Sequence, residues 1–281
     1  MYLQHFGLRE SPFSITPDTE FFYAYPRHQE ALDVLRVALA DGEGFIKITG
    51  EVGTGKTLIC RKLLAGLPAN VLSAWLPNPQ RDAQGLQVAL ADELGIDTRR
   101  LGAHELHKRL AERLIEHHHK GRRVVLVIDE AQALGEAGLE AVRLLTNLET
   151  EKNKLLQVVL FGQPELDAIL ARPSIRQLRQ RITFSYQLTP LDSDSVADYL
   201  SHRLRRAGYD GPQMFAPRAA RMLARGSRGV PRLVNILAHK SLMSAFGSGA
   251  RQVESVHVRR AIGDTPDASQ RSGRWWWLWE R

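Results

Sequence analysis

The pattern of hydrophobic and polar residues separates the chain into a first part that mixes strands with helices and a second part that is helical. Five short apolar runs predict strands, at residues 44–49, 71–76, 124–128, 155–161 and 182–186. The run at 124–128 is apolar throughout, as expected for a parallel strand that is covered on both faces. Amphipathic helices are predicted between these runs, for example at 82–94 and 104–119. The pattern therefore predicts an α/β domain with a parallel five-stranded sheet.

The chain beyond residue 190 contains helical patterns and no strand pattern. Helices are predicted at residues 191–208, 217–225, 233–246 and 253–262. We therefore expect a small all-helical domain at 191–262. Because residues 263–274 are polar, a flexible linker and a tryptophan-rich tail are predicted for 263–281.

The first 26 residues are rich in proline and in aromatic side chains. The prolines argue against a long helix and the aromatic residues argue against disorder, so we expect an extended arm packed on the domain behind it. A helix opens at 27–30 and carries Leu32 and Leu35 on its apolar face. The predicted domains are the arm at 1–26, the α/β core at 27–190, the helical domain at 191–262 and the linker with its tail at 263–281.

The segment Gly50–Thr57 reads GEVGTGKT and fits the phosphate-loop pattern G-x-x-x-x-G-K-[ST] in full. It lies between a predicted strand and a predicted helix, which is the context that this loop requires. Its glycines let backbone N–H groups turn toward an anion, and the helix N-terminus adds positive potential. Lys56 would reach the nucleotide phosphates and Thr57 would bind Mg²⁺ through its hydroxyl. The expected nucleotide-binding residues are Gly50, Glu51, Val52, Gly53, Thr54, Gly55, Lys56, Thr57 and Leu58.

An acidic pair, Asp129-Glu130, follows the apolar run at 124–128. Asp129 is expected to hold the Mg²⁺ shell, and Glu130 to orient or deprotonate the attacking water. An apolar strand that ends in two acids is weak evidence alone. Its position after a full phosphate loop makes it a strong indication of nucleotide hydrolysis.

Polar and basic residues near the two following strands are further candidates. Gln163 follows the run at 155–161, where a polar side chain would face the terminal phosphate, although a loop amide without function explains it equally well. Residues 172–181 contain Arg172, Arg176, Arg179 and Arg181. Arginines stabilise phosphoryl-transfer charge, including from a neighbouring subunit, so we expect one of the four to be functional rather than part of a solvated basic face.

Composition bounds the remaining alternatives. The chain has 281 residues, is 43% hydrophobic and carries a net charge of +7, which is compatible with nucleic acid or an anionic membrane. Its single cysteine, Cys60, excludes an intramolecular disulfide and is expected to be a small apolar residue rather than a reactive thiol. The adjacent histidines at 117–119 point to different helix faces, so they cannot converge on one metal ion. We expect them instead to be polar or cationic side chains that interact favourably with the C-terminus of their helix.

The sequence also bears on localisation. We find neither a signal peptide nor an apolar run long enough to span a bilayer, which predicts a cytoplasmic protein unless something tethers it. The tail contains Trp275, Trp276, Trp277 and Trp279 with Arg271, Arg274 and Arg281. Exposed tryptophans attract partners or membrane, so a docking role at the inner membrane or on a partner protein is expected. The alternative is that the tail folds back into a groove of its own domain.

With these motifs in place, the chain resembles the AAA+ ATPases, and among them the family of general secretion pathway protein A and MSHA pilus biogenesis protein M. The resemblance covers roughly residues 1–262. It is carried by the segments FGLRESPFSITPD, GEVGTGKT, VVLVIDEAQ, FGQPEL, LRQRI and GVPRLVN.

The resemblance implies roles for individual residues. Gln163 would be the first sensor, and Arg232 of GVPR would be the second, reaching the nucleotide from a helical lid. Arg181 looks like the arginine finger that acts on a neighbouring subunit, with Arg179 and Arg176 as alternates. His28 would contact adenine. One departure is that Gln163 is longer than the Asn or Thr common at this sensor.

The resemblance also implies a function. The leading interpretation is an oligomeric ATPase that uses ATP and Mg²⁺ to drive or switch assembly of an envelope machine. The favoured processes are MSHA-type type IV pilus biogenesis and type II secretion. Long secretion members continue through a membrane span into a peptidoglycan-binding domain, and the chain stops before either, so it resembles the short pilus-biogenesis member.

The alternative is a DNA-binding AAA+ ATPase of the transposition-helper or replication-initiator kind, supported by the net charge and the arginine-rich second half. No added helix-turn-helix module is found, so nucleic acid is the less favoured partner. A nucleotide-binding scaffold without turnover is disfavoured by Glu130.

Overall fold

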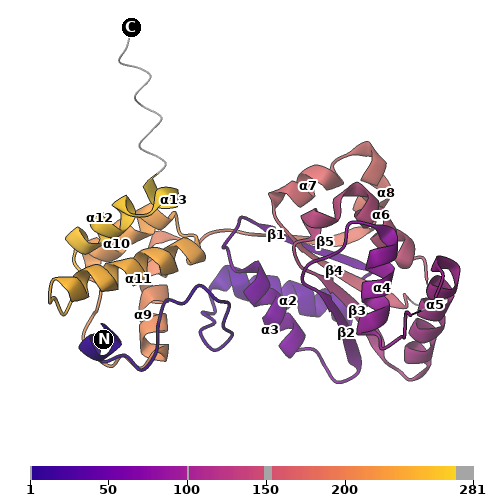
Figure 1. Cartoon of the computed structure of the whole chain (residues 1–281), viewed down its shortest axis with the longest axis horizontal. Helices are drawn as coiled ribbons and strands as arrows, with labels where there is room; N and C mark the ends of the chain where they lie inside the picture. Colours follow the sequence, from indigo (N-terminus) through magenta and orange to yellow (C-terminus); the bar gives the residue numbers. More distant parts are fainter. Residues whose placement is uncertain (1, 100, 149–153, 270–281) are drawn as a thin grey trace, which may run out of the picture. The chain divides into compact units, whose positions relative to one another are not determined.

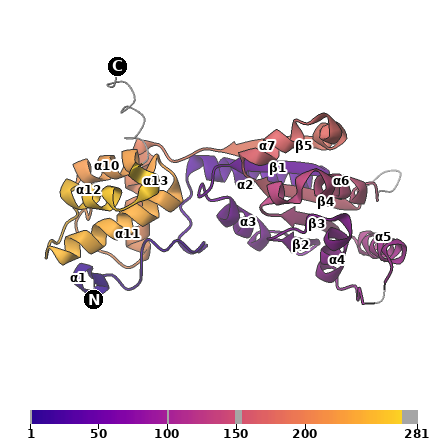
Figure 2. The same ribbon diagram turned by 45° about the horizontal axis from the view of Figure 1, so that its top comes forward.

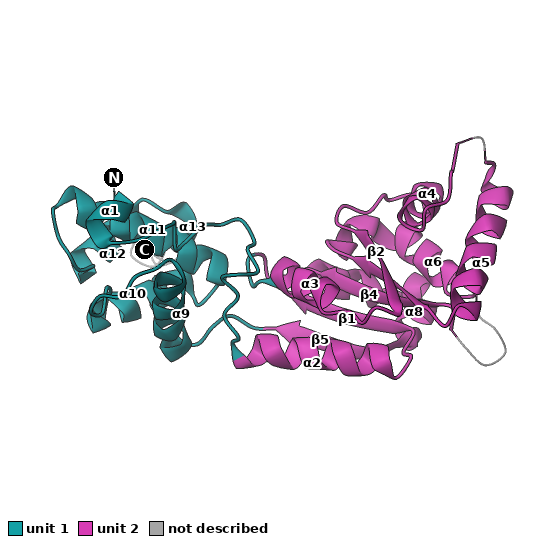
Figure 3. Ribbon diagram, turned by 90° about the horizontal axis from the view of Figure 1, so that it is seen from below, with its two compact units in different colours: residues 1–25, 53–55, 189–281 teal, residues 26–52, 56–188 magenta. Residues whose placement is uncertain are grey.

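The computed structural model describes residues 2–99, 101–148 and 154–269. It contains two compact units (Figure 3). Unit 1 comprises residues 1–25, 53–55 and 189–281, and unit 2 comprises residues 26–52 and 56–188. The predicted tryptophan-rich tail lies outside the described residues. Among the described residues, no helix is long and apolar enough to cross a membrane.

Unit 2 is built on a five-stranded sheet in the order β2-β3-β4-β1-β5 (Figure 1). The strands are β1 (Phe45–Gly50), β2 (Val71–Leu76), β3 (Arg123–Ile128), β4 (Leu156–Gly162) and β5 (Ile182–Leu188). Every neighbouring pair is parallel, which confirms the predicted parallel sheet. The three inner strands are almost entirely buried, as their continuous apolar character requires.

Helices connect the strands of unit 2. They are α2 (Pro26–Ala40), α3 (Lys56–Ala65), α4 (Ala83–Glu93), α5 (Ala103–His119), α6 (Gly135–Leu145), α7 (Pro164–Leu170) and α8 (Arg176–Arg181), with the 3₁₀ turns η1 (Ala131–Leu134) and η2 (Pro173–Ile175). Alternate residues of β3 and β4 pack with the apolar faces of α4, α5 and α6 in one core cluster. Helices α2 and α3 pack on each other (Figure 2). Helix α2 also contacts strands β1 and β5, and helix α3 contacts strands β1 and β4.

The regular secondary structure of unit 1 is helical in the part of the chain that the structure describes, apart from one isolated bridge between Phe215 and Val253, and loops and turns join the helices. Its helices are α1 (Tyr2–Phe6), α9 (Ser193–Arg206), α10 (Pro217–Ser227), α11 (Pro231–Gly247), α12 (Ser255–Gly263) and α13 (Pro266–Ser269). Gly229, in the turn between α10 and α11, has φ 71°, and a Cβ there would lie 1.9 Å from the Leu191 carbonyl oxygen. Only glycine fits this turn. The backbone N–H of Leu191 also donates a 2.9 Å hydrogen bond to the Gly229 carbonyl oxygen.

The N-terminal arm is part of the core of unit 1. Phe13 and Phe21 are 2% and 4% exposed and belong to the same cluster as the apolar faces of α9 to α12. The sequence predicts an extended arm, whereas the structure has a short helix, α1, at its start. The prolines begin only at Pro12, so they do not oppose a helical turn at 2–6.

The segment after α12 also differs from its prediction. Residues 263–274 are predicted as a flexible linker, but Pro266–Ser269 form α13. Thr265 is 5% exposed and donates a 2.8 Å hydrogen bond to the Ala261 carbonyl oxygen. This polar stretch is ordered by Pro266, which begins the short helix, and by the buried Thr265 before it. Composition alone does not reveal this order.

Candidate nucleotide site

The sheet order explains why the predicted residues meet. Strands β3, β4 and β1 are consecutive neighbours and are parallel, so their carboxyl ends lie at the same edge. Asp129 follows β3, Gln163 follows β4 and the phosphate loop follows β1. Segments that are about 30 to 110 residues apart in sequence therefore converge at one edge, where ligands bind in open α/β sheets.

The phosphate loop has the backbone that its pattern predicts. Gly53 and Gly55 have φ values of 83° and 101°, which side chains other than hydrogen rarely permit. Lys56 begins α3, is 5% exposed and donates from Nζ to the carbonyl oxygens of Gly50 at 2.7 Å and Glu51 at 3.0 Å. Burial lowers the pKa of Lys56, while the charges of Glu130 and Asp129 oppose this shift. The ammonium group is thus held against the loop and close to two acids.

Thr57 and Asp129 form the second part of the site. Thr57 Oγ1 donates to Asp129 Oδ2 at 2.9 Å, and the backbone N–H of Glu130 donates to Asp129 Oδ1 at 2.9 Å. Asp129 is 3% exposed. Burial raises the pKa of Asp129, and the hydrogen bonds from Thr57 and Glu130 oppose this shift. A hydroxyl and a carboxylate in direct contact are oxygen ligands of the kind Mg²⁺ prefers, so these residues fit the ion.

Glu130 is held by two glutamine amides. Its backbone is left-handed, with φ 51° and ψ 39°, which is uncommon for a residue other than glycine. Glu130 Oε2 accepts hydrogen bonds from Gln163 Nε2 at 2.8 Å and Gln132 Nε2 at 2.5 Å. Gln132 Oε1 in turn accepts the backbone N–H of Gln163 at 3.0 Å. Although burial opposes it, these bonds and the charge of Lys56 lower the pKa of Glu130.

Comparison with known proteins identifies the domain. A family model described as an AAA domain matches residues 39–170. General secretion pathway protein A of Aeromonas hydrophila is 44% identical over 254 residues, which cover 90% of this chain and 46% of that protein. The chain belongs to the AAA+ family of general secretion pathway protein A. It spans about half the length of this curated relative.

Solved structures with the same fold include AAA+ proteins of low sequence identity. Cdc6p from Pyrobaculum aerophilum has a TM-score of 0.66 and 22% identity, over 88% of this chain and 70% of that one. The ORC2 protein of Aeropyrum pernix has a TM-score of 0.62 and 18% identity, over 89% and 72% of the two chains. At these identities the likeness concerns the fold alone, and it confirms the predicted AAA+ architecture.

Gln132 is the residue of this AAA+ site that the sequence analysis did not assign. It lies in the segment VVLVIDEAQ, but its side chain could be placed only once the turn after β3 was known. The left-handed backbone of Glu130 and the 3₁₀ turn η1 bring Gln132 back toward the acid two positions before it. A polar residue two positions after Glu130 was the only signal in the sequence.

The candidate arginines of the AAA+ domain differ in their surroundings. Arg181 is half-buried and donates from Nη1 to Thr146 Oγ1 at 3.1 Å. Arg172 pairs with Glu136. Arg176 and Arg179 are exposed on α8, and the described residues provide neither side chain with a hydrogen bond or an ion pair. These two are therefore the guanidinium groups of the cluster that are free to act on another molecule.

The remaining predicted residues lie on separate elements. His28 is buried in α2, and Leu58 is half-buried in α3. Arg232 is at the start of α11 in unit 1, to which Gly53–Gly55 also belong. Its backbone N–H donates to the Gly53 carbonyl oxygen at 3.2 Å, and a Cβ on Gly53 would lie 2.6 Å from the Arg232 Cβ. Glycine at position 53 thus permits the close approach of Arg232.

The competing metal and thiol interpretations find no support in the structure. His117 is buried in α5 while His119 is exposed, and the described residues contain no cluster of three or more His, Cys, Asp or Glu side chains that could hold a metal. Cys60 is fully buried, and burial raises its pKa to about 12. A neutral thiol in the core fits the predicted small apolar residue.

Proposed function

We propose that the chain hydrolyses ATP with Mg²⁺ and that this activity drives or switches an envelope assembly machine. The observation that carries the ATPase part is the carboxylate of Glu130, held ionised by two amides beside a complete phosphate loop. A protein that only binds nucleotide does not need such a carboxylate.

The residues have distinct proposed roles. Backbone N–H groups of the phosphate loop and Lys56 bind the β- and γ-phosphates, because they combine the helix N-terminus with the positive charge of an ammonium group. Thr57 and Asp129 would hold Mg²⁺, which when bound neutralises phosphate charge. Glu130 accepts a proton from the attacking water or orients it, and Gln163 keeps the carboxylate in place. We also propose that His28 contacts adenine and that Arg232 is the second sensor. The hydrogen bond from the Arg232 backbone N–H to the Gly53 carbonyl oxygen supports the role of Arg232.

The nucleotide site is proposed to be completed by a second copy of the chain. An arginine supplied by a neighbour stabilises the charge that develops on the transferred phosphoryl group. The exposure of Arg179 and Arg176 favours them over Arg181, whose guanidinium already donates to Thr146. Self-association is therefore expected to be necessary for turnover.

The assembly role rests on the relationship to general secretion pathway protein A. We propose a cytoplasmic protein that acts at the inner membrane, on a component of type II secretion or of an MSHA-type type IV pilus. The segment 270–281, with its four tryptophans, is the proposed docking segment. Copurification from membranes, with and without residues 270–281, tests this part. Recovery of the same secretion or pilus component without the segment would contradict the docking role.

The ATPase proposal is tested by comparing three variants. Glu130→Gln should bind ATP and fail to cleave it, because the proton acceptor is lost. Lys56→Ala should weaken binding of ATP itself. Glu112→Gln, which removes an exposed carboxylate on α5, should leave phosphate release unchanged. Equal turnover in the wild type and Glu130→Gln would overturn the assignment.

A further inference from the structure

A line of arginines covers the outer face of α10. Its exposed residues are Pro217, Arg218, Arg221 and Arg225, and the helix ends at the exposed Arg228. The opposite face is buried in the core of unit 1 through Ala219, Ala220, Leu223, Ala224 and Ser227. We call Arg218, Arg221, Arg225 and Arg228 the arginine ridge. Intervals of three, four and three residues place all four on one side of the helix.

The ridge lacks acidic residues beside it in the sequence. Residues 211–253 contain seven arginines or lysines and no aspartate or glutamate. The described residues provide none of the four ridge side chains with an ion pair or a hydrogen bond. Helix α12, which packs against α10, carries the exposed Arg259 and Arg260. Helices α9 and α13 also contact α10 and carry the exposed acids Asp194, Asp198 and Asp267, but no ion pair joins these acids to the ridge. The ridge is therefore a line of four arginines that lack ion-pair partners among the described residues.

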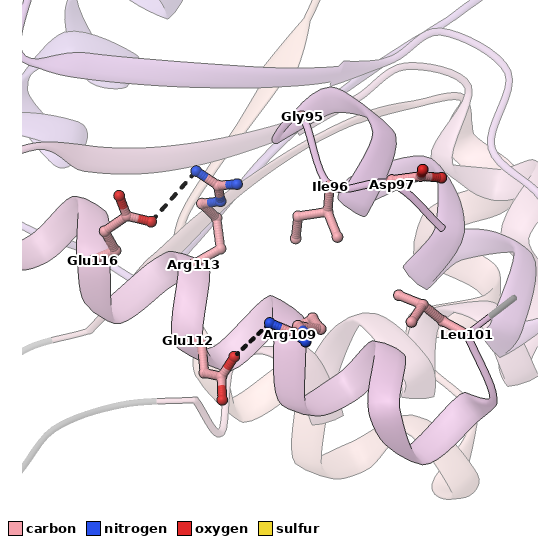
Figure 4. A pocket seen from close by; sticks show the side chains of 8 residues that line it. All are labelled: Gly95, Ile96, Asp97, Leu101, Arg109, Glu112, Arg113 and Glu116. Carbon is pink, nitrogen blue, oxygen red and sulfur yellow. Dashed lines mark ion pairs between the residues drawn. The ribbon is translucent and has the colours of Figure 1, made fainter. Parts of the chain in front are cut away.

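Helix α5 of the same chain shows the opposite arrangement. Arg109 pairs with Glu112, and Arg113 pairs with Glu116, beside a cavity of about 360 Å³ (Figure 4). Arg109 also pairs with Glu105. Opposite charges three or four residues apart support a helix, and like charges at the same intervals oppose it. The ridge has like charges at every such interval, and Arg218 lies in the first turn, where a cation is unfavourable. The ridge thus works against the helix that carries it, which points to a partner.

We propose that the arginine ridge binds the phosphate backbone of nucleic acid. Guanidinium groups recognise phosphate with two parallel hydrogen bonds, and all four ridge residues are arginine. Arg218 and Arg228 are ten positions apart, which corresponds to about 15 Å along a helix, a length over which one DNA strand presents roughly four phosphates. The exposed face has no asparagine or glutamine that would read base edges, so binding is independent of sequence.

The composition of the exposed face disfavours a lipid surface as the partner. Helices that lie in a membrane interface insert leucine, phenylalanine or tryptophan below a basic face. The apolar residues of α10 are instead used in the core of unit 1, and its exposed residues are proline and arginine. A single line of charges also matches a linear polyanion better than a plane of headgroups.

The salt dependence of DNA binding tests the proposal. The full chain is titrated with a fluorescent 20-base-pair duplex between 50 and 200 mM salt. Each neutralised phosphate adds about 0.9 to the slope of log affinity against log salt. The variant R218Q/R221Q/R225Q should bind more weakly, with a slope about two to three units shallower. Its fold should persist, because the substitutions remove repulsion between like charges.

A matched control separates the ridge from the net charge. R99Q/R109Q/R113Q also removes three positive charges, but from arginines that already have acidic partners. This control should keep the wild-type slope. Equal losses in both variants, or an unchanged slope in the ridge variant, would overturn the proposal. Loss of self-association in the ridge variant would also overturn it. The same holds if the ridge variant no longer binds phosphatidylserine vesicles but still binds DNA.

Discussion

The side-chain amide of Gln163 donates a 2.8 Å hydrogen bond to the carboxylate of Glu130, from the strand next to the one that carries the acid. Gln132 donates to the same oxygen atom, and its own carbonyl accepts the backbone N–H of Gln163. The three residues form a closed set of hydrogen bonds in which every contact depends on the other two. Both amides therefore help to hold the Glu130 carboxylate in place and, with the charge of Lys56, lower its pKa against the effect of burial.

We expect Gln132→Met to shift the acid limb of the pH profile of ATP hydrolysis. The hydrogen bonds of Gln132 and Gln163 lower the pKa of Glu130, so losing one raises it. A proton acceptor with a higher pKa is protonated at higher pH, and the defect should grow as the pH falls. We expect kcat to fall on the order of tenfold at neutral pH, as for the loss of one hydrogen bond to a charged group.

The control for this prediction is Gln187→Met on the exposed side of β5. It should leave kcat and the acid limb unchanged, and KM for ATP should change little in either variant. A Gln132→Met protein whose activity falls by the same factor at every pH would show that Gln132 supports the fold rather than the ionisation of Glu130.

Mixtures of inactive variants should identify the arginine finger. Glu130→Gln lacks the proton acceptor but can supply its arginine to a neighbour. If Arg179 acts on the adjacent site, mixing Arg179→Ala with Glu130→Gln should restore part of the turnover. Loss of such an arginine can reduce kcat by ~10³-fold or more, so recovery is easily seen. Arg181→Ala is the comparison, because the Arg181 guanidinium contacts Thr146 of its own chain.

Recovery with Arg181→Ala instead of Arg179→Ala would return the role to the residue that the family resemblance favours. Activity of the wild type that is independent of protein concentration, in a protein that stays monomeric, would contradict the dependence on a neighbour.

The parts of this site that follow from sequence are those fixed by local pattern. The phosphate loop and the acidic pair Asp129-Glu130 each follow a predicted strand, and parallel strands bring such positions to one edge. The pairing of Thr57 with Asp129 follows from this logic, although the two residues are 72 positions apart. The predicted strand at 71–76 was also recognisable, because it lies between two predicted helices.

Other features depend on contacts that no local pattern encodes. Gln132 reaches Glu130 only because Glu130 adopts a left-handed backbone, a conformation for which its sequence gives no signal. The arm joins the core of unit 1 because Phe13 and Phe21 pack with helices that begin about 170 residues later. The different surroundings of Arg179 and Arg181 arise from the position of Thr146 near the end of α6.

Cys60 should remain unreactive in the folded protein. Its side chain is fully buried, and burial raises its pKa from 9.0 to about 12. At pH 8 a disulfide reagent should label it only after unfolding. Since the folded pKa lies above the unfolded one, the stabilisation is complete below about pH 9 and is lost as the pH rises toward 12. The free energy of unfolding should fall by at most about 1.4 kcal/mol per pH unit from this group.

Cys60→Ala should lack this alkaline component, although its stability at pH 7 falls because a buried sulfur is removed. Denaturant titrations at pH 7 and pH 10 measure both effects. Rapid labelling of the native protein at pH 8, with no loss of structure, would contradict the burial of Cys60.

We expect the buried Arg203 to hold the N-terminal arm on unit 1 more strongly than the exposed Arg206 does. Arg203 is 5% exposed, donates from Nε to the Pro12 carbonyl oxygen at 2.5 Å, and lies 4.7 Å from the centroid of the Phe21 ring. Arg206, on the same helix, donates from Nε to the Glu20 carbonyl oxygen at 2.9 Å but is exposed. The two arginines make the same bond to the arm in different surroundings.

Arg203→Met should therefore destabilise unit 1 by about 2 kcal/mol, because a buried hydrogen bond and the contact with Phe21 are both lost. Arg206→Met should change the free energy of unfolding by less than about 0.5 kcal/mol, since water replaces an exposed partner. Thermal unfolding measures both values, and limited proteolysis shows whether residues 1–25 become cleavable first in Arg203→Met. Equal destabilisation by the two substitutions would mean that the arm is fixed by its aromatic residues alone, without a contribution from the Arg203 guanidinium.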